Sequence, residues 1–87
     1  MILTERNLKN TIKKTIEYKP YYDFHAMYKI KSVKRFFRKP ITVLEIYTSR
    51  PGLLIGYHGE TVYNLKKVLL EEFDISDVRI FETVNLF

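Results

Sequence analysis

The residues best suited to chemistry are three glycines that lie close together, Gly52, Gly56 and Gly59, with Tyr57 and His58 between the last two. The 87-residue chain contains no other glycine. Glycine allows positive φ angles and lets a ligand approach the backbone closely. A short apolar run precedes Gly56 and a helical pattern follows Gly59, so unpaired N–H groups at the helix start point into the turn. The pattern therefore fits a site for a phosphodiester backbone, or a helix–turn–helix joint that only needs small residues.

Other chemistry has little support in the residue types. The two histidines, His25 and His58, are 33 positions apart, and the chain has no Cys. None of the common nucleophile, zincin or P-loop motifs occurs. Two distant histidines and scattered carboxylates give no metal-ligand spacing. We therefore expect no enzymatic activity, no metal and no cofactor.

The charge is unevenly distributed along the chain. The net charge is +5, but the residues up to Pro40 hold 11 Lys and Arg against 3 Asp and Glu, or +8. From Ile41 onward there are 4 against 7, or −3. A basic half of this kind favours an acidic partner such as nucleic acid, although a basic surface can also serve only solubility. There is no signal peptide or membrane-span pattern, so we expect a single cytoplasmic domain.

Hydrophobic periodicity predicts the elements that must position the glycines. Thr4 is a helix cap, and apolar residues at every fourth position predict a helix that Pro20 closes. A β-rich stretch, a basic turn and a second β-rich stretch predict an antiparallel hairpin. The last strand follows a helical crossover and should lie parallel to the strand before that crossover. The predicted ranges are helix 4–18, strands 25–33 and 41–47, a helical pair over 52–73 and strand 78–84. This order, αββααβ, predicts a two-layer α+β fold with a three-stranded mixed sheet.

The segment Thr48-Ser-Arg-Pro-Gly-Leu-Leu-Ile-Gly-Tyr-His-Gly-Glu-Thr-Val-Tyr-Asn-Leu resembles the signature of type II KH domains. It is most similar to the KH domain of the ribosomal small-subunit protein that lies where mRNA enters the ribosome. The close match covers Thr48 to Leu65, and the element order extends it over about residues 4–84. The family has the same αββααβ order.

The resemblance implies a module that clamps about four unpaired nucleotides of single-stranded RNA. The backbone clamp would be Gly56, Tyr57, His58 and Gly59. A groove for the bases would be built or supported by Leu54, Ile55, Val62 and Ile80, for which plain core packing is the alternative. A basic rim across the groove would comprise Arg35, Arg38, Lys39 and Arg50, and the neighbouring Phe36 and Phe37 would either stack on bases or plug the underside of the sheet.

One departure from the family concerns the two residues inside the turn. The family usually places Lys or Arg there, whereas Tyr57 and His58 supply no fixed charge, which weakens the electrostatic part of the clamp. Single-stranded DNA remains an alternative ligand because nothing in the sequence reads a 2′-hydroxyl. A second alternative is a protein-interaction module. Strand alternation places Val43, Tyr47 and Phe81 on the sheet face opposite the helices, where they could bind a second copy or another protein unless Leu86 and Phe87 cover them.

Overall fold

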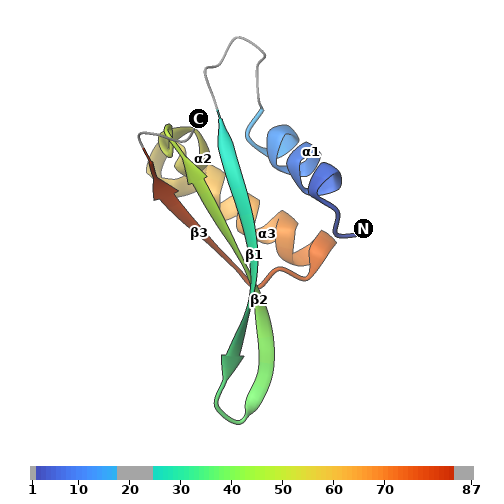
Figure 1. Cartoon of the computed structure of the whole chain (residues 1–87). Coiled ribbons are helices and arrows are strands. Elements are labelled where there is room, and N and C mark those ends of the chain that lie inside the picture. The colour runs from blue at the N-terminus through green and yellow to red at the C-terminus, as the bar shows by residue number, and fades with distance from the viewer. Residues whose placement is uncertain (1, 18–24, 84–87) are drawn as a thin grey trace.

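The computed structural model describes residues 2–17 and 25–83. Within them, the chain forms an α+β fold with a three-stranded mixed sheet and three helices (Figure 1). None of the helices in these residues has the length and apolar character needed to cross a membrane. The elements are α1 (Glu5–Thr15), β1 (Ala26–Arg35), β2 (Arg38–Thr48), α2 (Gly52–Ile55), a single 3₁₀ turn (Tyr57–Gly59), α3 (Glu60–Phe73) and β3 (Asp77–Glu82).

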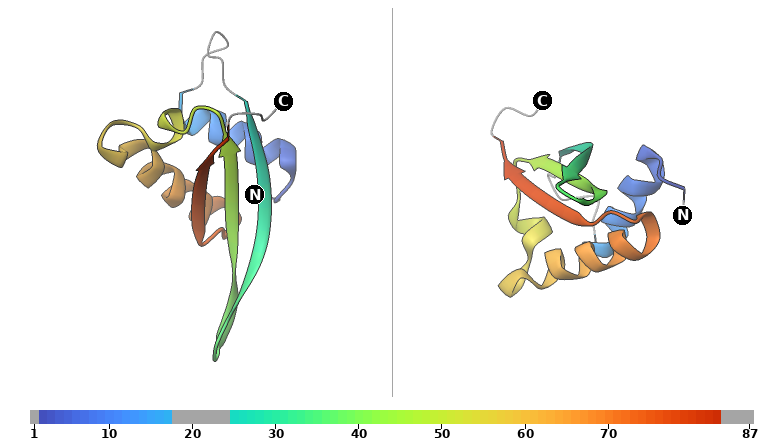
Figure 2. Two further views of the ribbon diagram at one scale, coloured as in Figure 1. Left: turned by 60° about the vertical axis from the view of Figure 1, so that its left-hand side comes forward. Right: turned by 90° about the horizontal axis from the view of Figure 1, so that it is seen from below.

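The sheet has the strand order β1-β2-β3, with β2 in the centre. β1 pairs antiparallel with β2, and β3 pairs parallel with β2, from Val43 opposite Asp77 to Thr48 opposite Glu82. The predicted hairpin and the predicted parallel crossover are therefore both confirmed. The helices cover one face of the sheet, and none of the helices in the described residues covers the other face, which we call the open face (Figure 2).

The hairpin is longer than the sequence pattern predicts. The strands extend to Arg35 and from Arg38, so only Phe36 and Phe37 remain as the turn where a basic turn of seven residues was expected. Pro40 lies inside β2, which is possible because β3 does not reach this part of β2. Proline has no N–H to donate, and a strand with a free side does not need one there.

The first helix begins as predicted and ends earlier. The Thr4 hydroxyl accepts a hydrogen bond from the Asn7 backbone N–H at 3.1 Å, which is the predicted cap. The helix ends at Thr15, and Glu17 has a φ of 54°, so the chain leaves the helical path before Tyr18. The remainder of the predicted segment, including Pro20, lies outside the described residues. α1 lies beside α3 in the helical layer (Figure 2).

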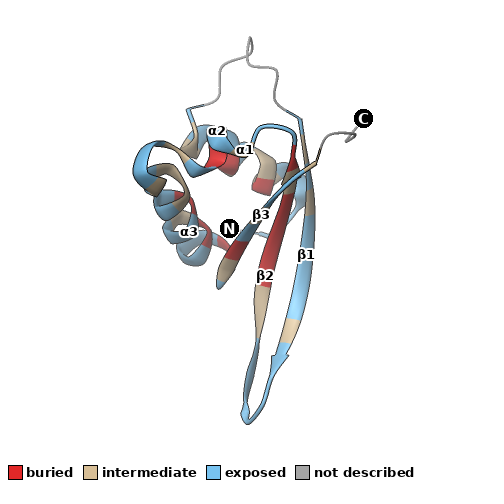
Figure 3. Ribbon diagram, turned by 90° about the vertical axis from the view of Figure 1, so that its left-hand side faces the viewer, coloured by how far each residue is buried: buried red, intermediate tan, exposed pale blue. Residues whose placement is uncertain are grey.

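The hydrophobic core lies between the helices and the inner face of the sheet. Its fully buried aliphatic side chains come mainly from α1, β2, α2 and α3, and Figure 3 shows buried positions both on β2 and on the helices beside it. These residues are Leu8 and Ile12 of α1, Leu44 and Ile46 of β2, Leu54 of α2, and Leu65 and Leu69 of α3. Each burial of this kind contributes about 1.5–3 kcal/mol, so the core fixes where α2 and α3 meet.

The opposite face of the sheet carries the side chains that strand alternation predicts. Tyr47 and Phe81 stack with ring centroids 5.0 Å apart, and Val43 is fully buried on the same face. Glu45 lies between them and is almost buried, since its carboxylate binds the Lys31 ammonium at 2.9 Å and accepts the Tyr47 hydroxyl at 2.8 Å. Residues 86 and 87, which we considered as a cover for this face, lie outside the described residues.

Glu45 should make stability depend on pH. Hydrogen bonds from Lys31 and then Tyr47 hold the pKa of Glu45 below its usual value. A carboxyl whose folded pKa is lowered stabilises the fold above its ordinary pKa of about 4.3, and that stabilisation disappears as pH falls through the folded pKa. We expect the wild type to have a higher urea midpoint than Glu45→Gln at neutral pH, and the difference to shrink on acidification below about pH 4. A difference that stays constant down to pH 3 would contradict this role.

Candidate nucleic-acid interface

The Gly-rich turn, residues 56–59, has a backbone that ordinary residues avoid. Gly56 has φ 73° and ψ −179°, His58 has φ 54° and ψ 25°, and Gly59 has φ 75° and ψ 13°. The Gly56 combination is accessible essentially to glycine alone, while the other two are left-handed conformations that cost a side chain about 1–2 kcal/mol. Three positive φ angles within four residues turn the chain sharply between α2 and α3. The sequence therefore needs its glycines here for the backbone path itself.

The two glycines differ in their surroundings. A Cβ built on Gly56 would collide with the Thr61 hydroxyl and would lie 2.6 Å from Thr61 Cβ. A Cβ on Gly59 would meet nothing within 4 Å. Gly56 is thus needed for packing as well as for conformation, whereas the space in front of Gly59 is open to a ligand.

The start of α3 is not capped by a side chain. Gly59 occupies the cap position and no side chain accepts a hydrogen bond from the first turn, in contrast to α1 with its Thr4 cap. The Gly59 and Glu60 N–H groups donate to the Gly56 and Tyr57 carbonyls inside the turn. The donors for an anion are therefore the N–H groups that follow Glu60, which have no partner within an α-helix, and the helix dipole places partial positive charge there. The exposed Glu60 carboxylate in the same turn opposes a bound anion. This end of α3 therefore offers hydrogen-bond donors to an anion but little net attraction.

Tyr57 and His58 project from the turn into solvent. Tyr57 is 79% exposed, His58 is also exposed, and their rings stack with centroids 3.9 Å apart. A stacked pair of exposed rings beside backbone donors gives a flat surface on which a nucleotide base can stack.

Thr48 connects the turn region to the sheet, and the sequence reading gave it no role. Its fully buried hydroxyl donates to the His25 carbonyl at 2.8 Å and accepts the Arg50 N–H at 3.1 Å. Its backbone carbonyl accepts the Thr83 N–H at 2.9 Å. The side chain thus joins the start of β1 to the segment that leads into α2. The sequence signal for this role was a threonine at the end of a predicted strand, just before an Arg-Pro-Gly turn.

Thr48→Val should therefore destabilise the fold without changing its shape. Valine has nearly the same volume but leaves the His25 carbonyl and the Arg50 N–H without this buried partner. Each of the two lost hydrogen bonds contributes about 0.5–1.5 kcal/mol, so we expect a loss of about 1–3 kcal/mol in urea unfolding. Thr42→Val, at a half-buried position of the same strand, is the matched control and should cost less. Equal losses in the two variants would show that the Thr48 hydroxyl has no special role.

The predicted groove residues separate into two kinds. Leu54 is completely buried in the core, and Ile80 packs against the core with part of its surface exposed. Ile55 is 41% exposed and Val62 is half-buried. Leu54 can thus only support a groove, while Ile55 and Val62 have surface on the two helices that flank the turn. An unbroken apolar run does not show which of its residues are buried. The sequence therefore did not predict that Leu54 is buried and Ile55 is exposed.

The predicted basic rim is not a single surface. Arg50 is exposed and stands directly before α2, at the end of the molecule that holds the Gly-rich turn. Arg35, Arg38 and Lys39 are at the far end of the β1–β2 hairpin, and Figures 1 and 2 both show that end well away from α2 and the start of α3. Phe36 and Phe37 are 85% and 92% exposed, so the alternative in which they plug the underside of the sheet is wrong.

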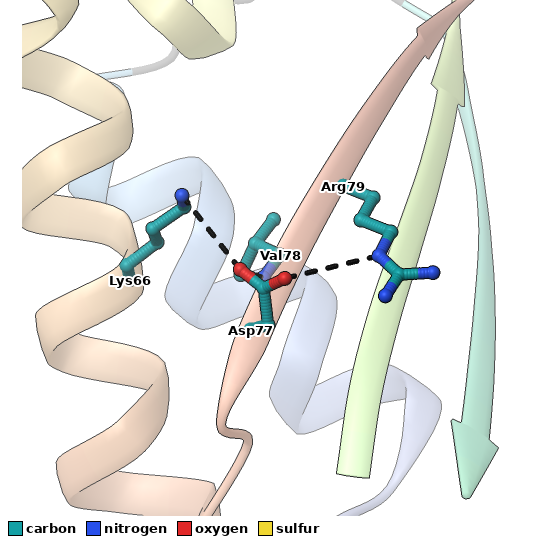
Figure 4. Close-up of polar contacts among 4 residues, drawn as sticks. All are labelled: Lys66, Asp77, Val78 and Arg79. Carbon is teal, nitrogen blue, oxygen red and sulfur yellow. Dashed lines mark hydrogen bonds and ion pairs between the residues drawn. The ribbon is translucent and has the colours of Figure 1, made fainter. Parts of the chain in front are cut away.

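Two basic residues of the second half are held beside a carboxylate. The Asp77 side chain lies 3.7 Å from the Lys66 ammonium and 3.8 Å from the Arg79 guanidinium, and it also accepts the Val78 N–H at 2.8 Å (Figure 4). Asp77 thereby connects α3 to β3 and offsets two positive charges. The hairpin end differs, because its four cations lie in a stretch, residues 24 to 44, that has no acidic side chain in the sequence.

Comparison of the chain with protein-family models, with curated proteins and with solved structures gives no match. The functional assignment therefore depends on the residues and geometry described above.

Proposed function

We propose that this chain is a non-enzymatic module that binds single-stranded RNA, with the Gly-rich turn as a clamp on the sugar–phosphate backbone. The observation that carries the proposal is the combination of an uncapped α3 start with open space in front of Gly59. A phosphate placed there can accept N–H groups from the backbone without displacing any side chain. The resemblance of Thr48 to Leu65 to the type II KH signature supports the same assignment.

Base recognition would use the surfaces beside the turn. Tyr57 and His58 offer stacked rings, and the exposed parts of Ile55 and Val62 offer apolar contact. Unpaired bases bind by this kind of stacking, whereas paired bases keep their faces inside the helix. We therefore expect selectivity for unpaired RNA over duplex. Affinity at the turn should be modest for two reasons. Arg50 is the only cation of the predicted rim at this end, and the Glu60 carboxylate repels a phosphate.

The test is direct binding to three ligands. Fluorescence anisotropy with the full chain would compare an unstructured RNA of about 12 nucleotides, the DNA of the same sequence and the RNA duplex, each at about 50 and 200 mM salt. We expect the single strand to bind more tightly than the duplex and affinity to fall with salt. If DNA binds as tightly as RNA, the turn still acts as a clamp but has no preference for RNA. Binding to none of the three ligands would overturn the proposal.

A protein-interaction module is the second candidate, favoured by the open face of the sheet. Phe81 is 40% exposed and Met27 is 44% exposed on that face, next to the Tyr47 ring. Sedimentation of the wild type and of Phe81→Lys would test it: a dimer that Phe81→Lys converts to monomer, without any change in RNA affinity, would assign this face to self-association.

A further inference from the structure

The hairpin continues beyond the rest of the sheet as an arm, residues 33–41. β3 pairs with β2 only from Val43 onward, and the Ser76 N–H donates to the Thr42 carbonyl at 2.8 Å, so sheet contacts from the third strand end there. Residues 34–40 are all exposed, and Figure 3 shows the pale-blue arm extending past the helices. An isolated hairpin is marginal in water, but this one extends a three-stranded sheet that anchors it.

Two phenylalanines form the end of the arm. The rings of Phe36 and Phe37 contact each other, with centroids 4.1 Å apart, and are otherwise exposed to 85% and 92%. Phe37 has a φ of 59°, a conformation in which Gly or Asn is the usual residue of a hairpin turn. Neither the turn conformation nor the core thus accounts for aromatic residues at this place. Their exposure instead indicates a contact with something outside the chain.

Four cations flank the two phenylalanines in the sequence, and no acidic residue lies among them. The hairpin tip, which we define as residues 34–39, carries Lys34, Arg35, Arg38 and Lys39. The Arg35 guanidinium donates two hydrogen bonds to the Lys39 carbonyl, at 3.1 and 2.9 Å, and so links the two strands beside the turn. The other three cations have no ion pair among the residues that the structure describes.

We propose that the hairpin tip is a second RNA contact, separate from the Gly-rich turn, in which Phe36 and Phe37 stack on unpaired bases and the surrounding cations bind phosphates. The proposal depends on the proposed function, because it assumes that the chain binds RNA. Aromatic rings interleaved with Lys and Arg are the combination that binds single strands without sequence preference. Apolar side chains beside a basic patch can also bind an anionic membrane. We choose RNA because the proposed function already gives the chain an RNA ligand, and the experiment below includes vesicles to test the alternative.

The distance between the tip and the turn makes the two contacts distinguishable. β2 has 11 residues, which at about 3.3 Å per residue span roughly 33 Å. The tip lies at one end of this strand, and α2 with the turn follows its other end. Four nucleotides stacked at about 3.4 Å per step cover only about 10 Å, so a short RNA reaches one contact and a long RNA reaches both.

The experiment compares RNA lengths. Anisotropy would measure the binding of unstructured RNAs of about 5 and 20 nucleotides to the full-length wild type, to Phe36→Ser with Phe37→Ser, and to Arg38→Gln with Lys39→Gln. Lys14→Gln with Lys67→Gln removes two exposed helix cations and is the charge-matched control. Circular dichroism would verify that each variant is folded.

Stacking contributes about 1–3 kcal/mol per base, so the Phe36→Ser, Phe37→Ser variant should lose at least about tenfold in affinity for the long RNA. Its affinity for the short RNA should fall less than its affinity for the long RNA, since the turn still binds a short RNA. The control should lose less for the long RNA than Arg38→Gln with Lys39→Gln. Similar losses for both RNA lengths would show that tip and turn form one site, and no loss for either length would remove the tip from RNA binding.

Two further outcomes separate this proposal from the proposed function. If Tyr57→Asp with His58→Asp leaves short-RNA binding intact while the Phe variant still weakens long-RNA binding, the clamp fails and the tip contact stands. If the wild type binds neither RNA, both are overturned. Vesicles of anionic lipid are the remaining probe. If the wild type binds the vesicles and Phe36→Ser with Phe37→Ser abolishes that binding without changing RNA affinity, the tip binds membranes and the RNA contact is overturned.

Discussion

Replacing Tyr57 and His58 together with Asp should strongly weaken binding of a short RNA while the protein stays folded. Both side chains are exposed, so the substitution changes no core contact. Two carboxylates would lie where a phosphate would accept hydrogen bonds from the α3 start, and each like-charge contact at about 4 Å costs about 1–4 kcal/mol near a protein surface. Affinity should therefore fall at least about thirtyfold. Anisotropy would measure the affinity, and thermal melting would confirm an unchanged midpoint.

Two control variants separate charge from shape. Tyr57→Asn with His58→Asn removes the stacked rings without adding charge, and it should lose less affinity than the Asp pair. Glu60→Gln removes the carboxylate that now opposes an anion in the first turn of α3, and it should bind RNA more tightly than wild type. Unchanged affinity in a folded Tyr57→Asp, His58→Asp variant would exclude this turn from the binding mechanism.

Much of the fold follows from local signals in the sequence. Thr4 capped the first helix as its residue type predicts, because its hydroxyl can replace a missing helical acceptor. Strand alternation placed Tyr47 and Phe81 on the open face correctly, since successive side chains in a strand point to opposite faces. The parallel pairing of β2 and β3 followed from the helical crossover between them. These features depend on short-range periodicity or on chain connectivity, which the sequence displays directly.

The features that the sequence did not reveal depend on where distant elements end. Pro40 and its basic neighbours indicated a turn, yet they form strand because β3 stops short of them and leaves one side of β2 free. The same extension of the strands carries Arg38 away from Arg50, so one predicted rim becomes two separate surfaces. The roles of Thr48 and Glu45 likewise depend on partners from another strand. Local periodicity predicts neither the length of a neighbouring strand nor the partner of a side chain on another strand.

Gly56→Ala should be the most destabilising single substitution in the turn. Its backbone conformation costs a residue with a Cβ about 1–3 kcal/mol, and the collision with Thr61 adds an overpacking cost of about 1–3 kcal/mol. Together these approach the whole stability of a small domain, about 5 kcal/mol at the lower end of the usual range. We expect urea unfolding to show a largely unfolded or strongly destabilised protein. A loss below about 1 kcal/mol would mean that the chain takes another path through the turn.

Gly59→Ala is the matched variant, because Gly59 has nearly the same φ but open space around its Cβ position. It should lose only about 1–2 kcal/mol and stay folded, so its RNA affinity can be measured. A methyl group there would stand between the α3 start and an approaching phosphodiester, and affinity should fall. If the folded variant binds RNA as well as wild type does, the glycines serve only the chain path, and the turn is the helix–turn–helix joint rather than a clamp.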